Sequence, residues 1–182
     1  MTTAPERTAA VLDSLAAHWP EASTEQAAAT IAAQRLARLL ARVAADALAP
    51  LGLTPAEFEL LSALRAHAPP HRLTPTELYD AMLISSGGLT KLLKGLEGRG
   101  LVARPASATD RRSRPVALTE AGRALAEQAM AAVQAAEAPM HRAMDTAWSD
   151  QARDGSSMAQ GLASLADAAD GAASAKMEKP RS

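Results

Sequence analysis

The chain has 182 residues, of which 48% are hydrophobic but only 2% aromatic, so alanine and leucine supply most of its apolar side chains. Such a composition favours helices, and with few large side chains a monomer would bury little apolar area per residue, which predicts a core shared in a dimer. The absence of cysteine excludes disulfides, thiolate metal sites and cysteine-based peroxide sensing.

Neither a membrane helix nor a secretory signal is evident in the sequence. No apolar run approaches the roughly 20 residues of a bilayer span. The N-terminal stretch lacks the basic region followed by an apolar region that marks a signal peptide. We therefore expect a soluble, cytoplasmic protein.

Positive charge is concentrated in one segment, although the formal net charge of the chain is −1. Residues 72–114 contain eight Lys and Arg against four Asp and Glu, so this segment carries +4 and the rest of the chain −5. A basic segment in an otherwise acidic chain suits a protein that binds DNA with one face only.

Two helical stretches precede the basic segment. Residues 1–22 contain a short amphipathic run that Pro20 stops, and so short a helix must pack on something larger to be stable. A longer helix is predicted from a cap at Ser23 or Thr24 to about residue 49. Its arginines are spaced three and four residues apart, which is most simply explained as a solvated face. These arginines are Arg35, Arg38 and Arg42.

Two further helices share one start signal. Thr54 and Thr74 each stand directly before a proline, the order that begins a helix, and Glu77 completes a capping box with Thr74. The second of these helices is the first helix of a helix-turn-helix motif. The residues predicted to form its buried side are Leu78, Ala81 and Met82.

Residues 83–86 are predicted to form a turn, and Ser85 or Ser86 caps the helix that follows. Leucines at spacings of three and four form the inward face of this helix. Small, hydroxyl-bearing and cationic side chains remain on its outward face, as a helix in the DNA major groove requires. The inward residues are Leu89, Leu92, Leu93 and Leu96. The outward residues are Ser86, Gly87, Thr90, Lys91 and Lys94.

Two short apolar runs, 101–104 and 116–118, are predicted to be the strands of a β-wing. The stretch between them is polar and basic, which is typical of a loop tip. Helix, turn, helix and wing together predict a winged helix-turn-helix that binds double-stranded DNA. The predicted fold class is mainly α, with a small β-wing and long helices at both ends.

The C-terminal part is predicted to be helical and then disordered. Thr119 caps a further helix, in which Pro139 predicts a kink or a break. A last helix is predicted to begin at Ser149 or Asp150. The small and charged composition of 171–182 predicts disorder.

Residues 73–119 resemble the multiple-antibiotic-resistance regulator (MarR) family of winged-helix repressors. The resemblance rests on LTPTEL, SSGGLTKLLKGLEGRGLV and DRRSRPVALTEAGR. It implies an obligate dimer, with recognition helices in adjacent major grooves and wings in the flanking minor grooves. The implied division is an amphipathic extension at 1–22, dimerisation helices at 23–53 and 119–170, a DNA-binding lobe at 54–118 and a tail at 171–182.

The resemblance also implies individual DNA contacts. By position, Ser86, Thr90 and Lys91 match the major-groove contacts of the family. Asp110 and Arg112 match a wing-tip pair, in which the carboxylate orients an arginine toward the negative potential of a minor groove. The full set of predicted DNA-binding residues is Ser86, Gly87, Thr90, Lys91, Lys94, Asp110, Arg111, Arg112 and Arg114.

Two residues depart from the family pattern. Gly95 stands where the family often has arginine, which predicts the loss of one phosphate contact. Pro115 stands in a wing strand where a backbone donor is usual, which predicts that this strand lies at an edge of the sheet.

Other residue patterns are better explained without a binding or catalytic site. Two prolines separate His67 from His71, and no acidic cluster is near, so both are interpreted as surface histidines. Trp19 and Trp148 are more typical of core or interface packing than of a ligand pocket. The sequence has no phosphate-binding loop, nucleophile elbow or metal-spaced set, so we predict a non-enzyme without cofactor or metal.

The leading hypothesis is a homodimeric, ligand-responsive repressor that binds a pseudo-palindromic operator and is released by a small molecule. The resemblance implies an aromatic or phenolic carboxylate as this effector, and Arg35, Arg38 or Arg42 is the predicted partner of its acid group. The alternative is a winged-helix module for protein–protein interaction without sequence-specific DNA binding. Only DNA binding predicts a steep loss of affinity with salt.

Overall fold

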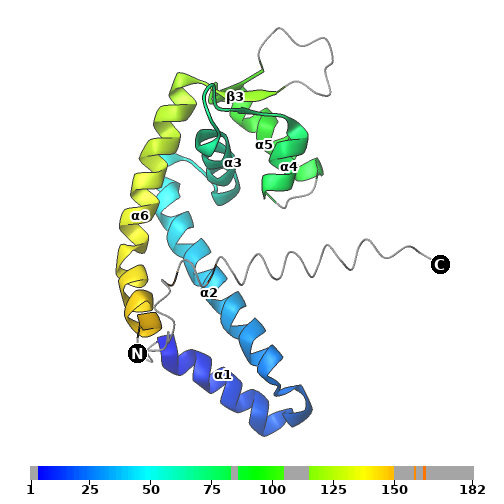
Figure 1. Cartoon of the computed structure of the whole chain (residues 1–182), viewed down its shortest axis with the longest axis vertical. Helices are drawn as coiled ribbons and strands as arrows, with labels where there is room; N and C mark the ends of the chain where they lie inside the picture. Colours follow the sequence, from blue (N-terminus) through cyan, green and yellow to red (C-terminus); the bar gives the residue numbers. More distant parts are fainter. Residues whose placement is uncertain (1–3, 83–85, 105–114, 150–157, 159–161, 163–182) are drawn as a thin grey trace, which may run out of the picture. The chain divides into compact units, whose positions relative to one another are not determined.

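The computed structural model describes residues 4–82, 86–104, 115–149, 158 and 162. The chain forms two compact units, Met1–Ala136 and Glu137–Ser182. The first unit is mainly helical and contains one small sheet (Figure 1). Among the described residues, no helix is both long and apolar enough to cross a membrane.

The N-terminal helices are α1 (Ala4–His18) and α2 (Glu25–Leu48), with the 3-10 turns η1 (Pro20–Ala22) and η2 (Ala49–Leu51). Thr24 caps α2 as predicted, because its Oγ1 accepts a hydrogen bond from the Ala27 N–H at 3.2 Å. Arg35 joins the two helices, since its Nε donates to the Thr8 Oγ1 at 3.0 Å. The short amphipathic helix thus packs on the longer one that follows it.

Three helices form the lobe with the helix-turn-helix motif: α3 (Pro55–Ala66), α4 (Pro75–Met82) and α5 (Ser86–Gly98). The first two begin with capping boxes. At the start of α4, the Glu77 N–H donates to the Thr74 Oγ1, and the Thr74 N–H donates to the Glu77 carboxylate at 2.7 Å. The predicted capping box is therefore confirmed, and Thr54 and Glu57 form a second one at the start of α3.

The sheet has three strands, β1 (Arg72–Leu73), β2 (Val102–Ala103) and β3 (Val116–Leu118), paired antiparallel in the order β1-β3-β2. Both predicted wing strands are confirmed. The prediction that the strand at Pro115 lies at an edge is wrong, because β3 is the central strand. Pro115 precedes Val116, the first residue paired with β1, so its missing N–H lies outside the paired register.

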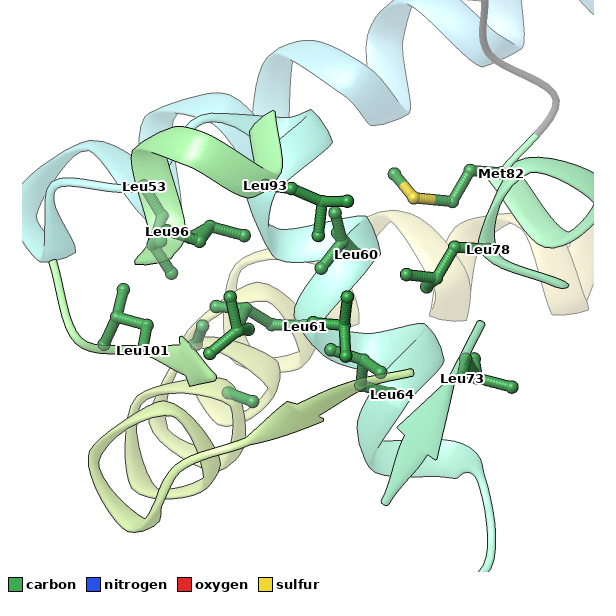
Figure 2. Packing of buried hydrophobic residues seen from close by; sticks show 14 of the residues in the cluster. Leu53, Leu60, Leu61, Leu64, Leu73, Leu78, Met82, Leu93, Leu96 and Leu101 are labelled. Carbon is green, nitrogen blue, oxygen red and sulfur yellow. The ribbon is translucent and has the colours of Figure 1, made fainter. Parts of the chain in front are cut away.

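The core of the lobe surrounds α3, whose Leu60, Leu61 and Leu64 are fully buried. Both α4 and α5 pack against this helix, and β3 contacts it as well. Figure 2 shows leucines from α3, α4, α5 and β1 pointing toward one another. On α4 the prediction for Ala81 is wrong. This residue is exposed, whereas Leu78 is buried, because Ala81 lies at the solvent edge of the helical face.

The longest described helix is α6 (Glu120–Ser149). Thr119 caps it as predicted, since its Oγ1 accepts a hydrogen bond from the Gly122 N–H at 3.0 Å. The helix has no break at Pro139 and continues to Ser149. Pro139 has no N–H to donate to the carbonyl four residues before it, so the helix loses one hydrogen bond there. The residues before and after Pro139 are nevertheless helical. The predicted last helix falls mostly outside the described residues.

Candidate nucleic-acid interface

Helix α5 has one buried and one exposed face, as its leucine spacing predicts. Leu89, Leu93 and Leu96 are buried, and α5 packs with them toward α3 and α4. The exposed side chains are those of Thr90, Lys91 and Lys94. A hydroxyl and two ammonium groups on one exposed helical face are donors suited to phosphate oxygens and base edges.

The two exposed lysines of α5 differ in their ion pairing from the arginines near the end of that helix. Arg99 pairs with Glu57 at 3.2 Å. Arg104 pairs with Glu97 at 2.6 Å. Both guanidinium groups are therefore partly neutralised within the lobe, whereas neither lysine forms an ion pair with any residue that the structure describes. The charge of the lysines remains available to a polyanion.

Part of the predicted interface lies outside the described residues. Ser86 and Gly87 begin α5, but only their backbone is described. The four predicted wing residues, Asp110, Arg111, Arg112 and Arg114, fall within 105–114, which is not described. Their DNA contacts therefore stay predictions. Of the predicted set, the described side chains that come together are Thr90, Lys91 and Lys94 on α5.

A hollow of about 630 Å³ lies between the start of α3 and the exposed face of α5. Its lining includes Lys91 and Gly95 on α5 and the capping residues Thr54 and Glu57 on α3. A Cβ placed at Gly95 would meet no atom within 4 Å. This position therefore has space for a long side chain beside Lys91, and glycine leaves that space empty.

The chain segment after α5 is fastened to the start of α6. Thr119 donates from its Oγ1 to the Gly100 carbonyl oxygen at 2.7 Å, and from its N–H to the Leu101 carbonyl oxygen at 3.1 Å. Gly122 lies directly against Leu101, because a Cβ at Gly122 would overlap the Leu101 carbonyl oxygen. Only glycine permits this approach. These four residues form what we call the α5–α6 joint, a feature that the sequence pattern did not predict.

Two exposed carboxylates at helix starts are held in their charged form. Hydrogen bonds from the backbone N–H and then the hydroxyl of Thr74 lower the pKa of Glu77 below its ordinary value. The hydrogen bond and the charge of Arg123 likewise lower the pKa of Glu120. Both carboxylates therefore stay ionised at neutral pH, where negative charge stabilises the first turn of a helix.

A second hollow, of about 390 Å³, lies between α3 and α6 and is called the α3–α6 hollow below. The residues that line it are Ser62, Arg65, Ala66, Ala126, Glu127, Met130, Ala131 and Gln134. Arg65 and Glu127 form an ion pair between the two helices, with the Nε 2.9 Å from the Oε1. Arg123 also contacts Glu127, at 3.4 Å. The hollow therefore combines small apolar side chains with one ion pair.

The three arginines predicted to bind an effector lie elsewhere. Arg35 is half-buried and donates to Thr8, whereas Arg38 and Arg42 are exposed on α2. None of the three lines the α3–α6 hollow. Their effector-binding role stays a prediction. The arginine that does line this hollow is Arg65, which the sequence pattern did not single out.

The histidines before β1 make a local contact. His71 is hydrogen-bonded through Nδ1 to the His67 carbonyl oxygen, at 2.7 Å. Within the described ranges, no group of three or more His, Asp or Glu side chains is placed to hold a metal ion.

The comparisons with known proteins agree on one family. Residues 51–113 match the model of the MarR family. The chain is 41% identical over 104 residues to the HTH-type transcriptional repressor Rv2887 of Mycobacterium tuberculosis, across 57% of this chain and 73% of that protein.

Two solved structures extend the comparison. The crystal structure of Rv2887 from Mycobacterium tuberculosis in complex with salicylic acid has a TM-score of 0.52 and 34% identity, across 68% of this chain and 95% of that chain. A mutant MarR from Escherichia coli complexed with operator DNA has a TM-score of 0.51 and 31% identity, across 60% of this chain and 79% of that chain.

Proposed function

The chain belongs to the MarR family of transcriptional regulators, and from this premise we propose that it is a homodimeric repressor that leaves its operator when a small molecule binds. Its relative in Mycobacterium tuberculosis is named a transcriptional repressor. A relative in Escherichia coli was crystallised with operator DNA. These names support repression through direct DNA binding by this chain.

The exposed face of α5 carries the proposal of DNA binding. Lys91 and Lys94 point away from the buried leucines and have no acidic partner among the described residues. We assign Thr90 and Lys91 to the major groove, together with Ser86 and Gly87 at the start of the helix, and Lys94 to the phosphate backbone. The side chain of Arg112, oriented by Asp110, enters the minor groove, and Arg111 and Arg114 contact phosphates.

The long N-terminal helix supports the proposal of a homodimer. Only Leu48 of α2 is buried, and Leu39 is 42% exposed. Trp19, which follows α1, is 63% exposed. Exposed large apolar side chains on α2 and directly after α1 are the kind of surface that a second copy covers. Such a dimer places two recognition helices about 34 Å apart, as two successive major grooves require.

An aromatic carboxylate is the effector that we propose. The support is that the relative Rv2887 was crystallised with salicylic acid. A guanidinium recognises a carboxylate well, because it offers two parallel donors. A small acid that binds better when the two recognition helices are at the wrong spacing would shift the dimer toward that state and release the DNA.

A mobility-shift assay with the intergenic DNA upstream of the gene for this chain tests the proposal. The apparent Kd is measured between 50 and 200 mM salt. A protein with six to ten phosphate contacts loses about 10³- to 10⁵-fold in affinity over this range. We expect such a loss, and a weaker complex for Lys91→Ala and for Arg112→Ala.

The alternative function has a different outcome in the same assay. If no DNA binds even at the lowest salt, the face of α5 serves a protein partner and the proposed function is wrong. If DNA binds but both variants bind as tightly as the unchanged chain, the residue assignment is wrong. Arg142→Ala is the matched control, since this arginine is exposed on α6 and outside the predicted DNA-binding set.

A further inference from the structure

The hollow between α3 and α5, called the α3–α5 hollow below, brings an ammonium and a carboxylate to one lining. Lys91 reaches it from the exposed face of α5, and Glu57 reaches it from the first turn of α3. Opposite charges in one hollow attract each other, and a lysine that paired with Glu57 would be lost to DNA. Both side chains are described, yet no ion pair joins them. The carboxylate must therefore be held by other groups.

The capping box of α3 fixes the position of Glu57. Its Oε2 accepts hydrogen bonds from the Thr54 N–H at 2.8 Å and from the Thr54 Oγ1 at 3.0 Å. The Glu57 N–H donates in turn to the Thr54 Oγ1 at 3.3 Å. The side chain of Glu57 is only 15% exposed. The start of α3 therefore keeps a carboxylate in the same lining as Lys91, because the capping box needs it there.

Arg99 supplies a counter-charge to this carboxylate from outside the lining. It directly follows α5, and its Nη1 donates to the Glu57 Oε1 at 3.2 Å, which is the oxygen that takes no part in the capping box. Its Nη2 lies near Gly52, since a Cβ at Gly52 would be 3.9 Å from that nitrogen. Arg99 does not line the α3–α5 hollow. The guanidinium thus neutralises Glu57 without entering the lining that Lys91 shares.

The capping box of α4 has the same hydrogen bonds but no such counter-charge. The Glu77 Oε2 accepts from the Thr74 N–H and from the Thr74 Oγ1, both at 2.7 Å. Within the described ranges, Glu77 forms no ion pair, and it does not line the α3–α5 hollow. An arginine is therefore present at the box whose carboxylate shares a lining with a lysine, and not at the other box. This difference indicates that Arg99 serves Lys91 and not the capping of the helix.

We propose that Arg99 is a positioning residue for DNA binding, because it holds the carboxylate of Glu57 and thereby leaves Lys91 free for DNA. The opposite charges of Arg99 and Glu57 largely cancel when seen from Lys91. Without Arg99, the carboxylate keeps its full charge and captures the ammonium of Lys91. The inference rests on the proposed function in taking the exposed face of α5 as the DNA-binding surface.

The main test compares Arg99→Gln with the double variant Arg99→Gln/Glu57→Gln in a mobility-shift assay on the operator fragment. Arg99→Gln should bind about 10-fold more weakly at about 0.1 M salt, with a salt slope reduced by about 1, because Lys91 then pairs with Glu57. The double variant should return to within about 2-fold of the unchanged chain, since glutamine also closes a capping box. A double variant as weak as Arg99→Gln would overturn the proposal, because Arg99 would then contact DNA directly.

A Lys91→Ala background shows whether the effect acts through this lysine. Adding Arg99→Gln to Lys91→Ala should cost less than about 2-fold in operator affinity, because no ammonium is left to capture. The same loss in both backgrounds would overturn the proposal.

Arg123→Gln is the matched control for Arg99→Gln. Arg123 also pairs with a glutamate, is 41% exposed and lies on α6 outside the lining of the α3–α5 hollow. Its replacement removes the same charge from the chain and should keep operator affinity to within about 2-fold. An equal loss for both arginines would mean that only the net charge of the chain matters, and the proposal would be wrong.

Amine labelling of the full chain reports the state of Lys91 without DNA. The labelling rate at Lys91, measured by mass spectrometry, should fall about 3-fold in Arg99→Gln and recover in the double variant, because an ion-paired ammonium is a poor nucleophile. Lys94 does not line the hollow and is the internal control, whose rate should stay constant. An unchanged rate at Lys91 would overturn the proposal.

The two readouts separate this inference from the proposed function. If the unchanged chain binds no DNA but Lys91 labelling responds as expected, the proposed function alone is wrong. If the chain binds DNA and Arg99→Gln changes neither readout, this inference alone is wrong. Should urea unfolding show that Arg99→Gln does not fold, Arg99→Lys keeps a counter-charge at the single oxygen of Glu57 and should bind the operator to within about 3-fold. A loss of about 10-fold or more for folded Arg99→Lys would count against the proposal.

Discussion

The exposed face of α5 and the α3–α6 hollow both present cationic side chains, but in opposite electrostatic surroundings. On α5, Lys91 and Lys94 have no acidic partner among the described residues. In the hollow, Arg65 is held by Glu127 at 2.9 Å. A cation without a partner attracts any polyanion, with an affinity that salt reduces strongly. A paired cation responds only to an anion that competes with its partner.

This difference separates two tasks within one small lobe. In the proposed function the lysines supply affinity for DNA without being selective about small anions, because an ammonium in water binds a single carboxylate weakly. In the hollow, Glu127 partly neutralises the charge of Arg65, so this arginine attracts a polyanion less strongly than the lysines do. The α5–α6 joint fastens the segment after α5 to the first turn of α6.

The largest expected effect comes from Gly122→Ala, which would disrupt the α5–α6 joint. The new Cβ would overlap the Leu101 carbonyl oxygen, so the joint must open. We expect a loss of about 3 kcal/mol in the free energy of unfolding, measured in urea, because the overlap is with backbone that cannot turn away. DNA binding should fall with it.

The matched control for that variant is Gly98→Ala. A Cβ at Gly98 meets no atom within 4 Å, and this residue is helical. Its replacement should be neutral or stabilise the chain by up to about 1 kcal/mol. Equal stability losses for both variants would mean that the close contact of Gly122 with Leu101 does not require glycine.

The next effect distinguishes the two regions directly. Replacing Lys91 and Lys94 together by alanine should weaken operator binding by about 10- to 100-fold at about 0.1 M salt, and should reduce the salt slope by about 2. The free energy of unfolding should not change, since both side chains are exposed on α5. Mobility shifts over a range of salt and urea unfolding of the double variant check this. A loss of stability without a loss of operator affinity would contradict the role that we propose for the two lysines.

Most of the α5 face was predictable from the sequence, because it depends on local periodicity. Leucines at spacings of three and four predict the buried side, and the structure buries Leu89, Leu93 and Leu96. Capping residues such as Thr74 mark helix starts, because their hydrogen bonds reach a residue only three positions further along the chain. Once the leucines are assigned to the buried side, the charged side chains of the helix are expected on its exposed side.

The hollow and the joint were not predictable, because both depend on contacts between segments far apart in the chain. Arg65 and Glu127 are 62 residues apart, and no spacing rule relates them. Gly122 stands in the first turn of a helix, where glycine usually lowers stability, and this was the only sign of its role. Strand β1 has two residues, too few to show a period, so the central position of β3 could not be foreseen.

A smaller effect would sharpen the description of the α5 face. Gly95→Arg places a guanidinium beside Lys91, where a Cβ has free space. We expect operator binding to tighten by several-fold at low salt and the salt slope to steepen by about 1, as for one added phosphate contact. Mobility shifts over a range of salt measure both quantities. Gly95→Gln is the control, because it adds a long side chain without charge and should leave the slope unchanged.

The smallest effect concerns the support of α5 by α4 and depends on pH. Hydrogen bonds from Thr74 hold the pKa of Glu77 below its ordinary value of 4.5. A carboxylate with a lowered pKa in the folded state stabilises the fold fully above the ordinary value, and this contribution is lost as the pH falls through the lowered pKa. Glu77→Gln removes the contribution. The unchanged chain should therefore be more stable than the variant at about pH 7.

That difference should shrink toward zero as the pH falls below about 4.5 and through the lowered pKa of Glu77. Urea unfolding of both proteins at several pH values measures it, and the difference between them cancels the contributions of other carboxylates. Glu59→Gln is the control, because this exposed glutamate of α3 takes part in neither capping box. A difference for Glu77→Gln that stays constant down to about pH 3 would show that the capping box acts through shape and not through charge, and α4 would then support the α5 face equally in acid.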